Sequence, residues 1–330
     1  MSSTQRLRVA FLTAVKLATL VTVAASQPVG AQQVGQHADT LLLDMAATIV
    51  RGGPSANELW HAPWYTDEFV IMSPDGRAVV VLPDLPPVEL GLPLAERVLG
   101  DSFPTPYLYA PVSGLPVRHG KQILGDRMIL AWPAYNSIFG IRDPLFATVM
   151  VMYHEIFHVY QARARWMLPG GTEPPVEVVT SREFQQLAVR ERGLLVQALE
   201  AADQDSVKTI LRSYLEARAD RMRLLPPQNR SMESTHESME GTANFVAYEA
   251  ALRAVRGNAA DLAELLKHDL VHTPPFDDPA RDLGSYRHWH VYATGAALAF
   301  LLDRLSPEGL WQAALEDGNT YQQLIAAAVR

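Results

Sequence analysis

The stretch from Asp143 to Trp166 constrains the fold most, because it combines a helix start signal with apolar residues at helical spacing. Asp143 followed by Pro144 is typical of an N-cap residue and a proline in the first turn. Apolar residues recur three and four positions apart along two sides of the predicted helix, which ends before Pro169-Gly170-Gly171. A helix that is apolar over most of its circumference is predicted to be buried.

The same helix carries the array His154-Glu155-Ile156-Phe157-His158. Residues four apart lie above one another on one helix face, so both imidazoles can bind one zinc ion. Glu155 lies one step round the helix, where it can contact a water on the zinc without being a ligand. Buried without partners, such polar groups would each cost roughly 1–3 kcal/mol. We therefore predict a zinc site with a general base beside it, because a surface histidine pair fits poorly with the apolar flanks.

The composition limits the other classes of protein. The chain has 330 residues and a net charge of −8, so it can bury a large core and nucleic acid is not an expected partner. It has no cysteine, which excludes disulfides, thiolate ligands and a cysteine nucleophile. Only His, Asp and Glu remain to hold a transition metal. No nucleophile elbow, phosphate-binding loop or dinucleotide fingerprint is found.

Residues 1–31 are typical of an export signal. Arg6 and Arg8 precede an apolar run, and Val29-Gly30-Ala31 offers small residues for cleavage. We expect a secreted or periplasmic protein, cleaved near Ala31, with no stable membrane insertion after the signal is removed. Lys16 within the apolar run is unusual for a signal, which leaves an uncleaved anchor as the alternative.

The region from 32 to 168 is predicted to form a small mixed sheet lobe that leads into the histidine helix. A helix over 38–51 should end at Gly52-Gly53-Pro54, and a hairpin should join strands 69–72 and 78–82. A short helix near 94–99 and strands at 123–124 and 128–132 complete this lobe. We take 128–132 as a candidate edge for an extended peptide, with an ordinary core strand as the alternative.

The region from 169 to 330 is predicted to form a helical lobe, with both lobes making one catalytic unit. Two helices should fill 181–223, divided near 203–206, and another should begin at a capping box formed by Ser234 and Glu237. Further helices are expected over 296–305 and 307–316 and at the end of the chain. The predicted fold class is therefore α+β, predominantly helical, with the histidine helix between a small mixed sheet and a helical lobe.

A catalytic zinc site needs a third protein ligand and an open position for water. The acidic and imidazole side chains of two later segments are the candidates: Glu237, Glu240, His236, His288 and His290. Glu240 lies where its helix becomes apolar, so its carboxylate needs a partner. Gly241 permits a close backbone approach, such as packing against the histidine helix.

Three patches resemble elements of gluzincin metallopeptidases, especially the aminopeptidase N family. These are His154-Glu-Ile-Phe-His158, Glu240-Gly-Thr-Ala243 and Tyr292-Ala-Thr-Gly295, which are similar to H-E-x-x-H, E-G-x-A and Y-x-x-G. The resemblance implies that Glu240 is the third zinc ligand and that Tyr292 stabilises the oxyanion. The chain departs from this family in two ways. The 181–223 helical pair separates Glu240 from the histidine helix. No segment is equivalent to the family's G-x-M-E-N, which binds the free amine of the substrate.

These observations predict an exported zinc metallopeptidase that acts on a peptide or protein substrate. Zinc would polarise the scissile carbonyl and activate a water, Glu155 would act as general base, and Tyr292 would stabilise the oxyanion, alone or with His288 or His290. Gln161, one turn beyond His158, is either a partner of a ligand or a solvent-facing residue. The alternatives are an exported non-catalytic zinc-binding protein and a zinc hydrolase of a non-peptide amide or ester. A purely structural site would have no use for Glu155.

Overall fold

A computed structural model describes residues 31–73, 77–81, 96–98, 107–111, 120–124, 127–134, 142–164, 166, 174–273, 289–306 and 309–330. Contacts divide the chain into Met1–His37 and Ala38–Arg330, and the second unit contains the described strands and helices except the first residues of α1. The elements of both predicted lobes therefore belong to one compact unit. The predicted export signal lies outside the described residues, apart from Ala31.

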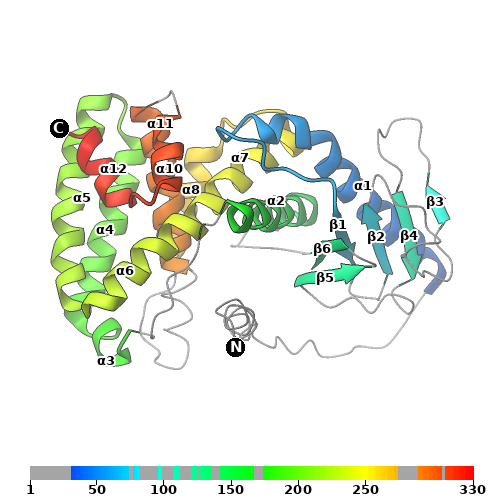
Figure 1. Cartoon of the computed structure of the whole chain (residues 1–330), viewed down its shortest axis with the longest axis horizontal. Helices are drawn as coiled ribbons and strands as arrows, with labels where there is room; N and C mark the ends of the chain where they lie inside the picture. Colours follow the sequence, from blue (N-terminus) through cyan, green and yellow to red (C-terminus); the bar gives the residue numbers. More distant parts are fainter. Residues whose placement is uncertain are drawn as a thin grey trace, which may run out of the picture. The chain divides into compact units, whose positions relative to one another are not determined.

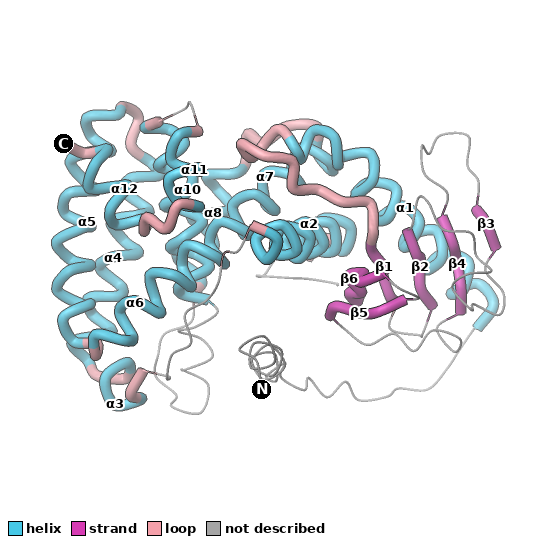
Figure 2. The backbone as a smooth tube through the Cα atoms, in the orientation of Figure 1, coloured by secondary structure: helices cyan, strands magenta, loops and turns pink. Residues whose placement is uncertain are grey.

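The strands form one mixed sheet in the order β3-β4-β2-β1-β6-β5 (Figure 2). Their bounds are β1 Phe69–Met72, β2 Arg77–Val81, β3 Glu96–Val98, β4 Tyr107–Pro111, β5 Gly120–Leu124 and β6 Arg127–Pro133. Strands β1 and β2 pair antiparallel with Phe69 opposite Val81, which confirms the predicted hairpin. Strands β1 and β6 run parallel with Phe69 opposite Leu130, and the other pairs are antiparallel.

Two predictions about the sheet are wrong. Strand β6 lies between β1 and β5, so residues 128–132 are not an edge; the edges are β3 and β5. The consecutive buried residues Ile129, Leu130 and Ala131 fit an interior strand that is covered on both faces. The short helix predicted near 94–99 is wrong because residues 96–98 pair with β4 as β3, and this non-local pairing outweighs a weak local helix pattern.

Helices make up most of the rest, which confirms the predicted α+β, predominantly helical fold (Figure 1). Their bounds are α1 Ala31–Asn57, α2 Pro144–Arg163, α3 Val176–Val179, α4 Arg182–Glu200, α5 Gln204–Leu224, α6 Pro227–His236, α7 Thr242–Arg256, α8 Leu262–His272, α10 Val291–Leu305, α11 Leu310–Glu316 and α12 Tyr321–Ala328. A single π-helical turn, η5 Glu237–Gly241, joins α6 to α7. The predicted helical pair is confirmed as α4 and α5.

Helix α2 lies at the centre of the core. Asp143 Oδ1 accepts hydrogen bonds from the backbone N–H groups of Leu145 and Phe146, at 3.1 and 3.2 Å, as its sequence position predicted. The helix packs against α7 and also contacts β6, so it lies between the sheet and the later helices. It is buried along most of its length, which confirms that its apolar character comes from core packing.

Helix α1 continues through the glycines that were predicted to end it. A Cβ atom at Gly52 would lie 2.3 Å from the Tyr153 hydroxyl and 2.7 Å from Ala254 Cβ. The Tyr153 hydroxyl also donates to the Ile49 carbonyl at 2.9 Å. Gly52 therefore serves the close crossing of α1 with α2 and α7, and not a helix end.

The predicted helix start at Ser234 is also wrong. The segment begins at Pro227, the first residue of α6, and continues through η5 and α7 to Arg256. Ser234 lies inside α6, where its carbonyl accepts from the Ser238 hydroxyl at 2.9 Å. Glu237 is therefore not part of an N-terminal capping box. The predicted end is confirmed, because Gly257 follows with φ 76°.

Candidate metal centre

The structure brings His154 and His158 of α2 together with Glu240 of η5. Their ligand atoms lie within 4.8 Å of one another. Glu240 Oε2 lies 3.3 Å from His154 Nε2 and 3.0 Å from His158 Nε2. Two imidazoles and a carboxylate from a distant segment therefore converge on one point.

Gln161 determines which ring nitrogen of His158 carries the proton. Its Nε2 donates to the Met239 carbonyl at 2.9 Å, so its Oε1 is the atom 2.6 Å from His158 Nδ1. His158 Nδ1 must then carry the proton, because Gln161 Oε1 can only accept. A neutral His158 would thus turn a lone pair on Nε2 toward a carboxylate oxygen. That contact is repulsive unless a proton or a metal cation lies between the two atoms.

The donor set and its dimensions fit zinc. Ligand atoms about 2.0–2.1 Å from a tetrahedral zinc lie roughly 3.3 Å apart. The separations of 3.3 and 3.0 Å between Glu240 Oε2 and the imidazole nitrogens agree with this spacing. Imidazole and carboxylate ligands suit zinc and other first-row divalent metals, whereas calcium and magnesium prefer oxygen ligands alone. Three protein ligands also leave a position for a water molecule.

The charges at this centre are strongly coupled. Burial lowers the pKa of His158, but the charge and hydrogen bond of Glu240, the charge of Glu155 and the bond to Gln161 outweigh it and raise the pKa to about 9. Burial raises the pKa of Glu240, but His158, His154 and His236 outweigh it and hold that pKa well below its usual range. These surroundings therefore favour an anionic Glu240 carboxylate, the form that binds a cation.

His236 contacts the other oxygen of the Glu240 carboxylate. Its Nε2 is 3.7 Å from Glu240 Oε1, and the two residues are one turn apart across α6 and η5. His236 was among the candidate third ligands, but it contacts Oε1 of Glu240, whereas His154 and His158 contact Oε2. Its position suits a residue that orients the carboxylate.

Glu155 differs from the other glutamates near the centre. It is half-buried, and no described residue donates a hydrogen bond to its carboxylate. Its negative charge nevertheless raises the pKa of both His158 and Tyr292, so it lies close to both. Its role as a base beside a metal stays a prediction.

Tyr292 also lies at this centre. Its ring stacks on His154, with ring centroids 5.5 Å apart and planes inclined by 11°. Burial, the charge and hydrogen bond of Glu240 and the charge of Glu155 raise its pKa well above the ordinary value. Tyr292 therefore keeps its hydroxyl proton and remains a hydrogen-bond donor.

Two other candidate residues lie in a different cluster. Arg218 binds both oxygens of Glu237, at 3.1 and 2.7 Å, so Glu237 is the partner of an arginine and is not the third ligand. His290 Nδ1 lies 3.4 Å from Arg192 Nη1. Burial and the charges of Arg221, Arg192 and Arg218 lower the pKa of His290 well below its usual range. His288 lies outside the described residues.

The two motif glycines contact each other. A Cβ atom at Gly241 would lie 2.3 Å from Gly295 Cα, and one at Gly295 would lie 2.4 Å from the Glu237 carbonyl oxygen. The predicted close approach at Gly241 is thus present, but its partner is α10 and not the histidine helix. This crossing places Glu240, just before Gly241, near Tyr292, three residues before Gly295.

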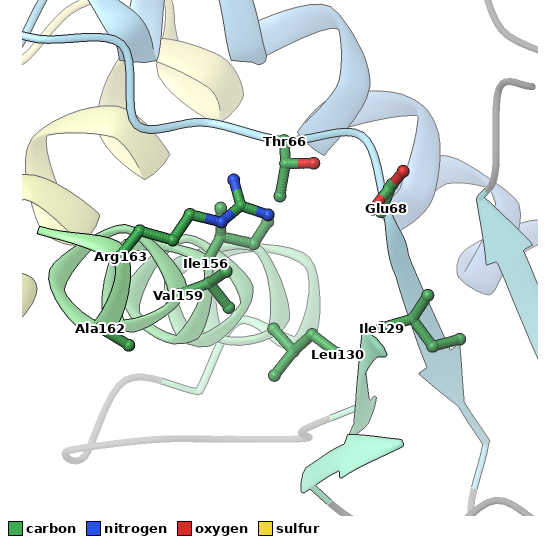
Figure 3. A pocket seen from close by; sticks show the side chains of 8 residues that line it. All are labelled: Thr66, Glu68, Ile129, Leu130, Ile156, Val159, Ala162 and Arg163. Carbon is green, nitrogen blue, oxygen red and sulfur yellow. The ribbon is translucent and has the colours of Figure 1, made fainter. Parts of the chain in front are cut away.

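A pocket of about 260 Å³ lies against another side of α2. It is lined by Ile156, Val159, Ala162 and Arg163 of α2, by Ile129 and Leu130 of β6, and by Thr66 and Glu68 (Figure 3). Ile156 and Val159 directly follow Glu155 and His158 in the sequence, but helical geometry turns their side chains away from those of the two histidines.

Comparison with known protein families, with characterised proteins and with solved structures gives no match. Among the helices that the structure describes, none has both the length and the apolar character of a membrane-spanning segment.

Proposed function

We propose that this chain is an exported zinc-dependent peptidase of the gluzincin type, with His154, His158 and Glu240 as the zinc ligands. One observation carries the proposal: the motif histidines meet a distant carboxylate, and the motif glutamate beside them has no hydrogen-bond donor among the described residues. A structural metal site would need only the first part of this arrangement.

Zinc in such a site supplies a Lewis acid that polarises a carbonyl and lowers the pKa of a water molecule toward 7. The Glu155 carboxylate accepts a proton from the attacking water and later passes it to the leaving amine, a step worth typically about 10²–10⁴-fold in rate. The Tyr292 hydroxyl, whose hydrogen bond goes to Glu240 in this structure, would donate it to the oxyanion when a substrate is bound. Gln161 holds the proton on His158 Nδ1, so that Nε2 remains a ligand.

The test is peptide hydrolysis by the zinc-loaded protein, with and without a chelator, alongside the variants Glu155→Gln and Glu177→Gln. Glu177 is an exposed glutamate on α3 and serves as the matched control. We expect the chelator to abolish hydrolysis and Glu155→Gln to lower kcat at least about a hundredfold while still binding zinc. The control should keep the parent activity.

The same assay distinguishes the other functions that the site allows. Zinc binding without hydrolysis of a peptide pool or of ester substrates would support a non-catalytic zinc-binding protein. Hydrolysis of esters or of other amides alone would support a hydrolase of a different bond. Hydrolysis that persists in chelator, or in Glu155→Gln, would overturn the proposed mechanism.

A further inference from the structure

Three glutamates and two arginines form a buried network beside the metal centre. Its members are Glu191 of α4, Arg218 and Arg221 of α5, Glu233 of α6 and Glu237 of η5, and each is at most 2% exposed. Arg221 binds Glu191 and Glu233, with closest contacts of 2.6 Å to each. Arg218 contacts Glu191 and Glu233 too, and of the two arginines it is the one that contacts Glu237.

Such a network is poorly explained by stability alone. Taking charges out of water is costly, and well-packed apolar residues often stabilise a core equally well. Buried ionic groups are better attested as devices that fix one register or arrangement of helices. The network joins α4, α5, α6 and η5, so it can fix the position of the turn that carries Glu240.

Glu237 connects the network to both parts of the metal centre. It lies in the same π-helical turn as Glu240, and such turns in helices are often found at functional sites. It also accepts a hydrogen bond of 2.5 Å from the Thr294 hydroxyl, two residues after Tyr292 in α10. One carboxylate therefore joins α5, η5 and α10, and the Gly241–Gly295 contact lies directly beside it.

We propose that Arg218, acting through Glu237, is a positioning residue that fixes the register of η5 and so holds Glu240 against His154 and His158. This inference rests on the proposed metal site. It predicts that breaking the Arg218–Glu237 contact weakens metal binding in protein that is still folded. A purely structural role would lower stability and leave the metal affinity of the folded protein unchanged.

The experiment compares Arg218→Met with Arg221→Met, two fully buried arginines of the same network. Zinc affinity is measured by competition with a chromophoric chelator, and the absorption spectrum of the cobalt-loaded protein reports ligand geometry. Circular dichroism first establishes that each variant is folded. We expect Arg218→Met to weaken zinc binding about ten- to hundredfold and to alter the cobalt spectrum. Arg221→Met should stay close to the parent in both measurements.

A milder pair keeps the test decisive if an arginine variant does not fold. The Thr294 and Thr273 hydroxyl oxygens lie 2.9 and 2.8 Å from the carbonyl oxygen four residues earlier, but only the Thr294 hydroxyl also contacts Glu237. Thr294→Val should lower zinc affinity and Thr273→Val should not. If the two variants of a folded pair bind zinc equally well, the positioning role is wrong, but the proposed metal site is unaffected. A parent protein that binds no zinc would instead overturn the proposed function, and this inference with it.

Discussion

Replacing Gly241 with alanine tests whether the crossing of η5 and α10 sets the metal centre. The new Cβ atom would lie 2.3 Å from Gly295 Cα and 2.5 Å from Gly295 C, both backbone atoms. Real Cβ atoms essentially never approach closer than 3.0 Å, so the two backbones must separate by at least about 0.7 Å. A functional site tolerates only about 0.5 Å of displacement, and Glu240 is the adjacent residue.

Two opposing effects determine how much Gly241→Ala changes the free energy of unfolding. Overpacking costs about 1–3 kcal/mol, while alanine in a helix gains about 1 kcal/mol over glycine. Gly241→Ala should therefore lower the free energy of unfolding by up to about 2 kcal/mol, measured by urea unfolding. It should also weaken zinc binding about ten- to hundredfold, measured by chelator competition.

Gly193→Ala is the matched control, because a Cβ atom at this α4 position meets no atom within 4 Å. It should raise the free energy of unfolding by about 0.5–1 kcal/mol and leave zinc affinity unchanged. If Gly241→Ala is stabilising like the control and binds zinc like the parent, the close glycine contact does not position Glu240.

Two other changes probe the centre, and a third probes a buried carboxyl on α8. Gln161→Leu should weaken zinc binding about ten- to hundredfold, measured by chelator competition, because His158 Nδ1 loses its acceptor; unchanged affinity would contradict the assigned tautomer. Tyr292→Phe should lower kcat about 10²–10³-fold in steady-state hydrolysis while zinc stays bound, and an unchanged kcat would exclude it as the oxyanion donor. Burial raises the pKa of Asp269 from 3.8 to about 7, although the hydrogen bond from Tyr248 lowers it. Below about pH 4 this carboxyl is protonated in both the folded and the unfolded protein and costs no stability. As the pH rises through 7, the folded protein must hold a buried carboxylate, so its free energy of unfolding falls. Asp269→Asn should therefore raise the free energy of unfolding at pH 8 by up to about 4 kcal/mol, measured by urea unfolding. If the variant is no more stable than the parent at pH 8, ionisation of Asp269 does not cause the pH dependence.

Local sequence signals were sufficient to predict the central helix and part of the centre. Asp143, Pro144 and the apolar spacing define α2, and helical geometry alone places His154 and His158 on one face. The β1–β2 hairpin was also predictable because strand alternation and a turn signal lie together in the sequence. These features depend on residues close to one another in the chain.

Features that depend on distant segments were predicted less well. Gly52 looks like a helix end until its contact with Tyr153 is seen, and residues 96–98 become a strand only by pairing with β4. Glu237 and His290 carry no local sign that arginines of α4 and α5 will be their partners. The resemblance to E-G-x-A was needed to favour Glu240 over Glu237, because both are acidic residues in the same helical stretch.

X-ray absorption at the zinc edge of the loaded protein tests the central claim most directly. We predict one zinc per chain, bound by two imidazole nitrogens and by oxygen atoms at about 2.0–2.2 Å. The variant His158→Ala should lose one imidazole from this shell, and the exposed control Glu177→Gln should keep both. A zinc shell without imidazole, or one that is unchanged in His158→Ala, would contradict the assignment of the site.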